Sequence, residues 1–269
     1  MNFKISVAMP VYNTKEYVKD AIESILNQSF KDFEFIILDD YSTDGSYEIC
    51  QEYSKKDKRI KLYRNEKNMW ISYTRNKLVE LSTTNFIAIQ DSDDISLKDR
   101  LKLEYEFLSN NPEYWVVSWN NIIIDEEWNE IWKRIYSDDI KNVILKKSPI
   151  SQPSAMFKKD VFKKVWWYNE KLNYAEDYDL RIRMYLNWYK IKNLNEFLVK
   201  YRIRNWQTKS KKLKETLKNT ILIQKNAIKK WLKPSLSDRF YIFAEQILYF
   251  FPSSFIMWLF KKLTYKNEK

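Results

Sequence analysis

The sequence predicts an α/β protein with a mostly parallel, Rossmann-like sheet flanked by helices and with a helical C-terminal extension. The first observation is that short apolar runs begin near residues 5, 33, 60 and 86, at intervals of 26 to 28 residues. The second is that a helical pattern separates each run from the next. Strands that alternate with helices pair in parallel, and the helices cover the faces of the sheet.

The first half of the chain supplies most of these elements. We expect strands over 5–11, 33–38, 60–63 and 86–89, with helices over 13–28, 46–55 and 71–81 between them. Asn13 and Glu16 have the spacing of a capping box at the start of the first helix. Ser96 and Asp99 have the same spacing before a helix that runs to about residue 108. A strand over 116–125 and a helix over 177–186 follow.

Two helical segments are predicted near the C-terminus. An amphipathic pattern covers 213–231 and ends before Pro234, and an aromatic-rich stretch covers 240–260. That stretch is long enough to span a bilayer, but Glu245, Gln246 and Pro252 interrupt it and favour a position in the membrane interface. The alternative is a helical hairpin packed on the body of the protein or on another subunit. We therefore expect a domain over 1–206 and a basic, aromatic-rich tail over 207–269.

The tail also carries the net positive charge. The chain has a formal net charge of +11, and from residue 201 onward there are 16 Lys and Arg residues against four acidic residues. A basic tail predicts an anionic partner, either a membrane surface or a nucleic acid, and the alternative is a solvated lysine-rich helix. The aromatic residues cluster with aliphatic residues instead of alternating with Lys and Arg. We therefore expect an anionic membrane surface and no nucleic acid.

The composition excludes several kinds of chemistry. Hydrophobic residues make up 45% of the chain, as in ordinary globular domains. The chain has one cysteine, Cys50, and no histidine. Internal disulfides, Ser-His-Asp triads and zinc sites built on histidine or several cysteines are therefore excluded. The segment before Ile5 is too short and too polar for a signal peptide, so we expect a cytoplasmic protein.

Glycine is nearly absent and tryptophan is abundant. The chain has one glycine and 11 tryptophans, although about 7% glycine is usual. Several tryptophans, among them Trp128, Trp166, Trp167 and Trp188, lie where the local sequence favours a turn. Such turns need the positive φ angles that glycine adopts freely. We hypothesise that the tryptophans stand at UGA codons that the source reads as glycine; the alternative is a truly tryptophan-rich protein.

Carboxylates cluster where two predicted strands end. Asp39 and Asp40 follow the second strand, and Asp91, Asp93 and Asp94 follow the fourth. Ligands of open parallel sheets bind beyond the carboxyl ends of the strands. Acidic groups gathered there repel one another unless a cation or hydrogen-bond donors offset their charge, and hard oxygen ligands suit Mn²⁺ or Mg²⁺. For each cluster alone, a solvated loop or an Asx turn is the alternative.

Five motifs occur in order over residues 5–180. They are Ile5-Ser-Val-Ala-Met-Pro-Val-Tyr-Asn13, Ile37-Leu-Asp-Asp-Tyr-Ser-Thr-Asp-Gly-Ser46, Asn68-Met-Trp-Ile-Ser-Tyr-Thr-Arg-Asn76, Ile87-Ala-Ile-Gln-Asp-Ser-Asp-Asp94 and Ala175-Glu-Asp-Tyr-Asp-Leu180. Together they resemble the motifs of the family 2 glycosyltransferases, which have the GT-A fold. Members of that family usually have glycine where this chain has Trp70, Trp166, Trp167 and Trp188, which agrees with the codon hypothesis.

The resemblance implies a nucleotide site in the first half of the chain. Pro10, Tyr12 and Asn13 would line the base, and Asp39 would accept a hydrogen bond from the edge of a uracil. Asp40 and Arg75 would also lie near the nucleotide.

The resemblance also implies the metal site and the general base. Asp91 and Asp93 match the DxD motif, with Asp91 toward the ribose and Asp93 on a Mn²⁺ or Mg²⁺ that bridges the diphosphate. Asp177 would deprotonate the acceptor hydroxyl, which then attacks the sugar with inversion. The alternative role of Asp177 is that of an acidic residue favoured at a helix start.

Two features differ from other members or subgroups of the family. Arg204, in Tyr201-Arg-Ile-Arg204, stands where the family often has a metal-binding histidine. Arginine does not ligate a metal, but it can neutralise a diphosphate directly. The Gln-x-x-Arg-Trp motif of processive synthases is absent, which favours transfer of a single sugar.

These features lead to one main expectation. We expect an inverting glycosyltransferase that uses a nucleotide sugar, preferably a UDP-sugar. Its acceptor would be a glycan or a lipid-linked glycan, and it would make cell-envelope polysaccharide at the inner face of the cell membrane. The alternative is a catalytically inactive protein that binds nucleotide sugars or a membrane surface.

Overall fold

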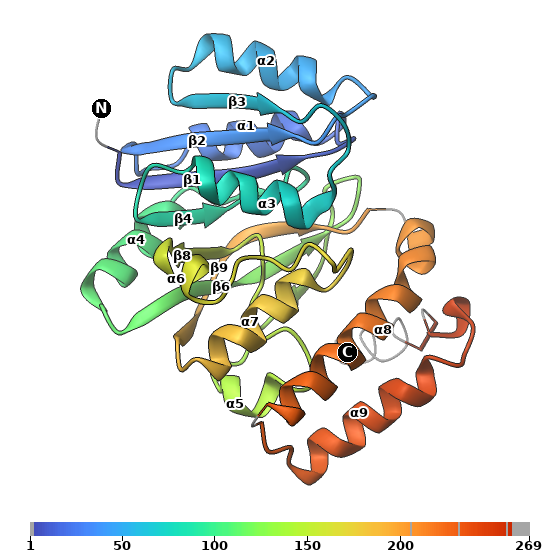
Figure 1. Ribbon diagram of the computed structural model, residues 1–269. Helices are drawn as coiled ribbons and strands as arrows, with labels where there is room; N and C mark the ends of the chain where they lie inside the picture. The colour runs from blue at the N-terminus through green and yellow to red at the C-terminus, as the bar shows by residue number, and fades with distance from the viewer. Residues whose placement is uncertain (1–2, 205, 231, 257, 260–269) are drawn as a thin grey trace.

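A computed structural model describes residues 3–204, 206–230, 232–256 and 258–259. Its described part contains one sheet of nine strands in the order β3-β2-β1-β4-β8-β6-β9-β5, with β7 paired to β6. The first half consists of β1 (Ile5–Val11), α1 (Val18–Leu26), β2 (Phe33–Asp39), α2 (Ser46–Lys56), β3 (Ile60–Arg64), α3 (Trp70–Leu81) and β4 (Phe86–Ile89). The α/β class predicted from the sequence is confirmed (Figure 1).

The predicted parallel arrangement holds for this first half. β1 pairs in parallel with both β2 and β4, and β2 pairs in parallel with β3. β1 and β2 are buried along their whole length, because helices cover both faces. Val7 and Met9 pack with α1 on one face, and Ala8 packs with α3 on the other.

The second half makes the sheet mixed. It contains β5 (Ile95–Ser96), α4 (Arg100–Asn110), β6 (Tyr114–Ile124), β7 (Glu130–Arg134), α5 (Ile140–Val143), β8 (Ala155–Lys158), α6 (Asp160–Lys164), α7 (Glu176–Leu186) and β9 (Lys190–Arg202). β6 and β9 are parallel, whereas β8 is antiparallel to both β4 and β6. The sequence did not predict β5, β7, β8, β9, α5 or α6.

Both predicted helix caps are wrong. α1 begins at Val18 without a side-chain cap, because the Asn13 side chain accepts a hydrogen bond from Thr43 N at 2.9 Å instead. α4 begins at Arg100, because Ser96 belongs to β5 and its hydroxyl donates to Gln90 Oε1 at 2.6 Å. In both cases a contact between distant segments replaces the local one.

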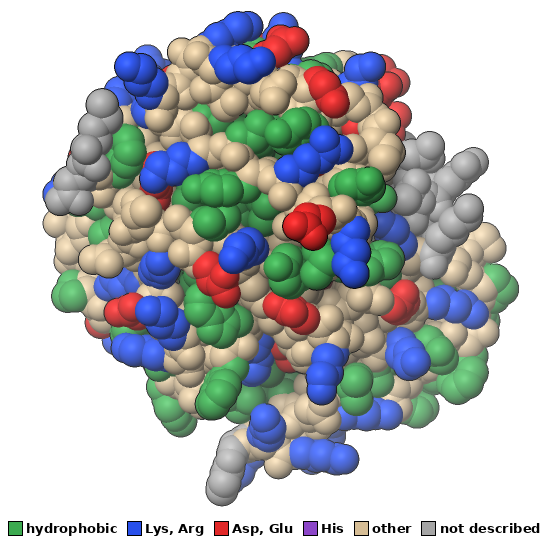
Figure 2. Space-filling view, turned by 45° about the horizontal axis from the view of Figure 1, so that its top comes forward, with side chains coloured by type: hydrophobic (Ala, Val, Ile, Leu, Met, Phe, Trp, Pro, Cys, Tyr) green, Lys and Arg blue, Asp and Glu red, His purple; other side chains and the backbone are tan. Residues whose placement is uncertain are grey.

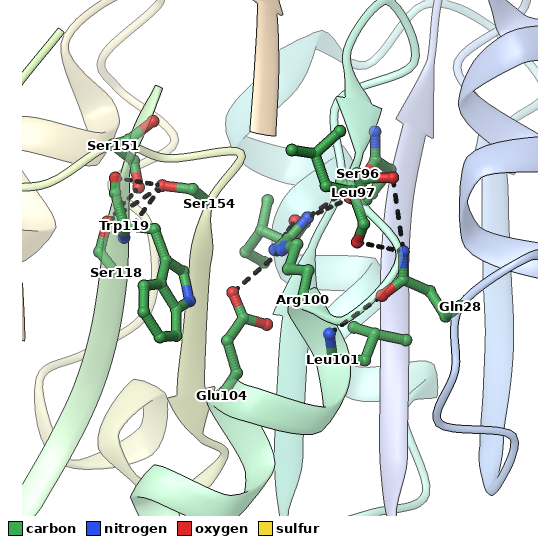
Figure 3. Close-up of polar contacts among 12 residues, drawn as sticks. Gln28, Ser96, Leu97, Arg100, Leu101, Glu104, Ser118, Trp119, Ser151 and Ser154 are labelled. Atoms are coloured by element: carbon green, nitrogen blue, oxygen red, sulfur yellow. Dashed lines mark hydrogen bonds and ion pairs between the residues drawn. The ribbon is translucent and has the colours of Figure 1, made fainter. Parts of the chain in front are cut away.

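A polar network fills part of the core beside α4. Arg100 is fully buried; it pairs with Glu104 at 2.9 Å and donates to the carbonyl oxygen of Ile89 at 2.7 Å. Figure 3 shows its guanidinium between Glu104 and the segment at Ser96, while Gln28 reaches the same segment from beyond α1. This network ties α4 to the strand ends from which the predicted carboxylates extend.

The C-terminal extension consists of α8 (Trp206–Lys229) and α9 (Leu236–Leu248). Figure 1 shows α8 beside α7 and α9 on the far side of α8, at the end of the molecule opposite α2. α9 begins with a capping box formed by Ser235 and Asp238. The predicted stretch over 240–260 is divided after α9, and residues 257 and 260 lie outside the described part. Within the described residues, no helix combines the length and the hydropathy that crossing a bilayer requires.

Candidate active site

A cavity of about 890 Å³ opens where β1 and β4 end. We call it the central pocket. Its walls come from these strand ends, the start of α3, the first turn of α7, the end of β9 and one side of α8; the lining residues used below are Pro10, Tyr12, Asp40, Trp70, Arg75, Asp91, Asp93, Glu176, Arg204, Lys212 and Thr216. This is the place where ligands of open α/β sheets bind.

The structure brings most of the predicted site residues to this pocket. Seven of them line it, namely Pro10, Tyr12, Asp40, Arg75, Asp91, Asp93 and Arg204. Asn13 lines an adjoining hollow that also includes Asp93 and Arg204. Asp39 and Asp177 are not among the lining residues of either cavity.

Asp39 lies behind the pocket wall. Its Oδ2 accepts a hydrogen bond from Ser42 N at 3.1 Å and pairs with Arg64 Nε at 3.1 Å. Its Oδ1 is buried and has no hydrogen-bond partner among the described residues. Burial raises the pKa of Asp39, although Ser42 and Arg64 oppose the shift. The next residue, Asp40, faces the pocket and accepts a hydrogen bond from Met69 N at 2.8 Å.

Two arginines hold the acidic residues that follow β4. Arg75 Nη2 lies 3.1 Å from Asp91 Oδ1, and Arg204 Nε lies 2.6 Å from Asp93 Oδ2. Asp94 points away into the protein, where its Oδ1 accepts a hydrogen bond from Arg202 N at 2.7 Å. Burial and the neighbouring Asp93 raise the pKa of Asp94 well above its usual value. Asp94 therefore anchors the end of β9, while Asp91 and Asp93 face the pocket.

Glu176 is a pocket residue that the sequence did not single out. It is the first residue of α7, it is buried, and its carboxylate forms an ion pair with Arg75. Burial raises the pKa of Glu176 to about 7, against the opposing charge of Arg75. Arg75 thus joins Glu176 to Asp91 across the pocket. The acidic pair in the motif indicated a functional helix start, but not which carboxylate faces the cavity.

Asp177 has a different environment one residue later. Its Oδ2 lies 2.7 Å from Arg181 Nη1, and its Oδ1 accepts a hydrogen bond from Tyr178 N at 2.8 Å. Burial alone would raise the pKa of Asp177, but the charges of Arg181 and Arg75 outweigh it and the net shift is downward. Asp177 is therefore an ionised carboxylate at neutral pH beside the pocket wall.

The residues of the pocket fit a divalent cation only together with a ligand. Among the described residues, no group of three or more carboxylates, cysteines or histidines could enclose a metal ion. Asp91 and Asp93 offer carboxylate oxygens, and Mg²⁺ is typically held by one or two carboxylates plus phosphate oxygens of the substrate. The ion pairs of Asp91 with Arg75 and of Asp93 with Arg204 would have to rearrange around such an ion.

Comparison with known proteins identifies the family. Residues 6–166 match the family described as Glycosyl transferase family 2. The chain belongs to this family. It is 41% identical over 210 residues to an uncharacterized glycosyltransferase of Methanocaldococcus jannaschii. The alignment covers 75% of this chain and 71% of that protein. It is 30% identical over 269 residues to EpsE of Bacillus subtilis, named as a glycosyltransferase, across 99% of this chain and 96% of EpsE.

Solved structures have the same fold. TarS of S. aureus, crystallised with UDP, aligns with a TM-score of 0.64 at 22% identity and covers 82% of this chain and 65% of its own. The mannosyltransferase PcManGT of Pyrobaculum calidifontis, in complex with GDP-Man and Mn²⁺, aligns with a TM-score of 0.68 at 15% identity. This alignment covers 94% of the present chain and 71% of PcManGT. The expected GT-A fold is thereby confirmed, and the protein is a family 2 glycosyltransferase.

Proposed function

We propose that this glycosyltransferase moves one sugar from a nucleotide diphosphate sugar, preferably a UDP-sugar, to a hydroxyl group of a glycan or lipid-linked glycan. The proposal rests on one observation: two carboxylates and two arginines, Asp91 with Arg75 and Asp93 with Arg204, face one cavity at the end of β4. Such a set can neutralise a diphosphate with or without a divalent cation. Solved structures of the same fold in complex with UDP, UDP-GlcNAc and GDP-Man support this ligand class.

The nucleotide would lie along the loops after β1 and β2. Pro10, Tyr12 and Asn13 would line the base, and the buried Oδ1 of Asp39, which has no partner among the described residues, would accept an N–H of uracil after a small movement of the wall. Asp91 would face the ribose, and Arg75 would position Asp91. Asp91 and Asp93 would hold Mn²⁺ or Mg²⁺ against the diphosphate, and the bound ion would stabilise the leaving group.

The reaction also needs a base for the acceptor hydroxyl. We propose Asp177 in this role, as the family motif implies, acting by displacement that inverts the anomeric configuration. The adjacent Glu176 lines the pocket and has the higher pKa, so it is the competing candidate. Asp177→Asn keeps an oxygen toward Arg181, and Glu176→Gln keeps one toward Arg75. If Asp177 is the base, only Asp177→Asn abolishes transfer while UDP binding survives; the reverse result would assign the role to Glu176.

The cellular role is proposed from the relatives. WbnJ of Escherichia coli, 35% identical over 216 residues, is named as an O-antigen biosynthesis glycosyltransferase. TuaG of Bacillus subtilis is named as a teichuronic acid biosynthesis glycosyltransferase. We propose synthesis of cell-envelope polysaccharide at the inner face of the cell membrane. A catalytically inactive nucleotide-sugar-binding or membrane-surface protein is the alternative, and it predicts nucleotide binding without transfer.

A calorimetric titration of UDP with and without Mn²⁺ tests the donor site. It is run on the chain with Trp70 and on Trp70→Gly, because the Trp70 indole lines the pocket. We expect binding that Mn²⁺ strengthens and that Asp93→Ala abolishes, while Glu52→Ala, an exposed carboxylate on α2, has no effect. No binding of UDP, GDP or dTDP to either form would overturn the proposal.

The tail would hold the enzyme at the membrane. Five exposed apolar residues lie three or four positions apart along α9 and just beyond its end. We call them the α9 stripe; they are Leu236, Phe240, Phe243, Ile247 and Phe250. Figure 2 shows basic and apolar side chains next to one another over the lower right of the molecule, where α8 and α9 lie. An apolar stripe with basic neighbours is typical of helices that lie in a membrane interface. We therefore propose peripheral attachment to an anionic membrane through the α9 stripe, with the tail over 207–269 as a membrane-binding unit.

A further inference from the structure

Five tryptophans have backbone conformations that favour glycine. Their φ angles are 68° at Trp70, 73° at Trp128, 65° at Trp166, 58° at Trp167 and 62° at Trp188. Residues with a Cβ atom are strained in this left-handed region, and large side chains rarely occupy it. In the described part of the chain, these five make up most of the eight residues other than glycine with positive φ. Chance placement does not explain this concentration in one residue type.

Trp188 occupies the glycine position of a complete helix-ending motif. Tyr189 N donates to Met184 O at 3.1 Å, and Trp188 N donates to Tyr185 O at 3.0 Å. These are the two hydrogen bonds of a Schellman motif, in which the residue at the position of Trp188 is left-handed and is usually glycine. The Trp188 side chain is 90% exposed, so burial of the indole does not offset the strain.

The end of α6 repeats the motif. Trp167 N donates to Phe162 O at 2.8 Å, and Trp166 N donates to Lys163 O at 3.4 Å. Trp166 holds the left-handed position, and its side chain is 84% exposed. Two helices therefore end in the same way, each with an exposed tryptophan in the glycine position.

Trp128 lies in the turn between β6 and β7. Asp125 N donates to Asn129 O at 3.1 Å, and Trp128 N donates to Asp125 O at 3.4 Å. A hairpin loop of this length places its last residue in the left-handed region, and glycine is preferred there. Trp128 does contact the Arg202 guanidinium, which lies 4.4 Å from its ring.

Trp70 combines a left-handed backbone with a place in the central pocket. It begins α3 beside Asn68, whose Oδ1 accepts a hydrogen bond from Trp70 N at 3.1 Å. Its indole lines the same cavity as Asp40 and Arg75. A glycine here would keep the backbone conformation and remove the indole from the cavity.

We infer that the functional protein carries glycine at positions 70, 128, 166, 167 and 188, and that glycine at position 70 opens the pocket for the nucleotide sugar. The second part rests on the proposed function, whereas the first part stands on backbone geometry alone. The strand tryptophans Trp115, Trp119 and Trp132 have no positive φ, so the geometry does not require glycine at those positions.

Thermal unfolding of single variants tests the first part, with each tryptophan changed to glycine and separately to alanine. Both changes remove the indole, but only glycine removes the Cβ atom that is strained at positive φ. We expect each glycine variant to melt about 2–4 °C above its alanine counterpart. Trp132 lies in the extended strand β7, so the melting temperature of Trp132→Gly should be no higher than that of Trp132→Ala. Equal melting temperatures for glycine and alanine at all five positions would overturn the inference.

The codons provide a second, independent readout. UGA at the five positions, read as glycine by the source, is the expected result. UGG at all five would show that the cell makes tryptophan there, and the inference would be wrong.

UDP binding tests the second part. We expect Trp70→Gly and Trp70→Ala each to lower the Kd for UDP about tenfold, because both remove the indole that lines the pocket. No gain for either variant, while Asp93→Ala still abolishes UDP binding, would overturn the inference that glycine at position 70 opens the pocket. Absence of UDP binding in every variant would instead count against the proposed donor site and leave the melting comparison intact.

Discussion

Arg204 and Asp93 form an ion pair at the edge of the central pocket, with Arg204 Nε 2.6 Å from Asp93 Oδ2. The family motifs predict that Arg204 takes the position of a metal-binding histidine. A guanidinium carries a permanent positive charge and does not ligate a cation. It offsets the charge of Asp93, and under the proposed function it would also meet a diphosphate bound beside that carboxylate.

The Arg204–Asp93 pair predicts how metal dependence changes with residue 204. We expect Arg204→Ala to weaken UDP binding about tenfold without metal, because a charged hydrogen-bond donor to the diphosphate is lost. Arg204→His should restore binding only with Mn²⁺. Calorimetric titrations of UDP without Mn²⁺ and at saturating Mn²⁺ measure both effects, with Arg239→Ala on α9 as a control. An unchanged Kd for Arg204→Ala without metal would show that Arg204 does not contact the diphosphate.

The buried pair of Arg100 and Glu104 predicts a large loss of stability when one partner is removed. Both side chains are fully buried and lie 2.9 Å apart (Figure 3). Arg100→Met would leave the Glu104 carboxylate without its counter-charge and should lower the free energy of unfolding by about 3–5 kcal/mol. The double variant Arg100→Met with Glu104→Leu should recover most of that loss. Urea unfolding followed by circular dichroism measures the three variants, and additive losses would contradict the predicted coupling.

Glu245 predicts that attachment of α9 to α8 weakens as the pH rises. Burial raises the pKa of Glu245 from 4.5 to about 7, although Gln224 Nε2 donates to it at 2.7 Å. The folded state therefore holds a proton that the unfolded state releases between these values. Its stabilising effect is complete below pH 4.5 and is lost as the pH rises through about 7.

Glu245→Gln isolates this effect from the other carboxylates. The variant should match the unmodified protein near pH 4.5 and exceed its stability by up to about 3 kcal/mol at pH 8. Hydrogen exchange of the α9 amides and urea unfolding, both measured across this pH range, provide the comparison. A difference that stays constant with pH would contradict the assignment to Glu245.

The first half of the fold could be predicted because its strands are buried on both faces. Such strands are continuous apolar runs, and the four runs of β1 to β4 match the structure within one residue. β9 escaped prediction because it mixes Lys and Asn with apolar residues and is held by pairing along β6. The predicted helix cap at Asn13 failed for a similar reason, because the hydrogen-bond partner of its side chain, Thr43, lies 30 residues away in the sequence.

The motifs located most of the candidate site, but not the direction of each side chain. Asp39 is the last residue of β2 and Asp40 follows it, and adjacent residues of a strand point to opposite sides. Only Asp40 reaches the pocket. Of Glu176 and Asp177 only Glu176 lines the pocket, because successive residues of a helix point about 100° apart. Lys212 and Thr216 enter the pocket because α8 packs beside α7. Those contacts arise from tertiary packing, which local patterns do not encode.

The α9 stripe predicts binding to anionic vesicles. Phe240, Phe243 and Phe250 are 74%, 59% and 81% exposed, and burial of one such side chain in an apolar medium contributes about 1.5–3 kcal/mol. The triple variant with serine at these three positions should lose more than a hundredfold in affinity for vesicles that contain phosphatidylglycerol. Replacement of the exposed Tyr41 and Tyr63 by serine is the matched control and should have no effect.

Vesicle sedimentation with and without phosphatidylglycerol measures this prediction, because the basic side chains beside the stripe should favour the anionic surface. Equal sedimentation of the triple variant and the unmodified protein would exclude the α9 stripe as the contact. Sedimentation velocity without vesicles tests whether a second copy of this chain, instead of a membrane, covers the α9 stripe. A dimer that forms without vesicles and that the three serines abolish would make the stripe an interface between two copies of this chain, and the basic tail would then meet the membrane through charge alone.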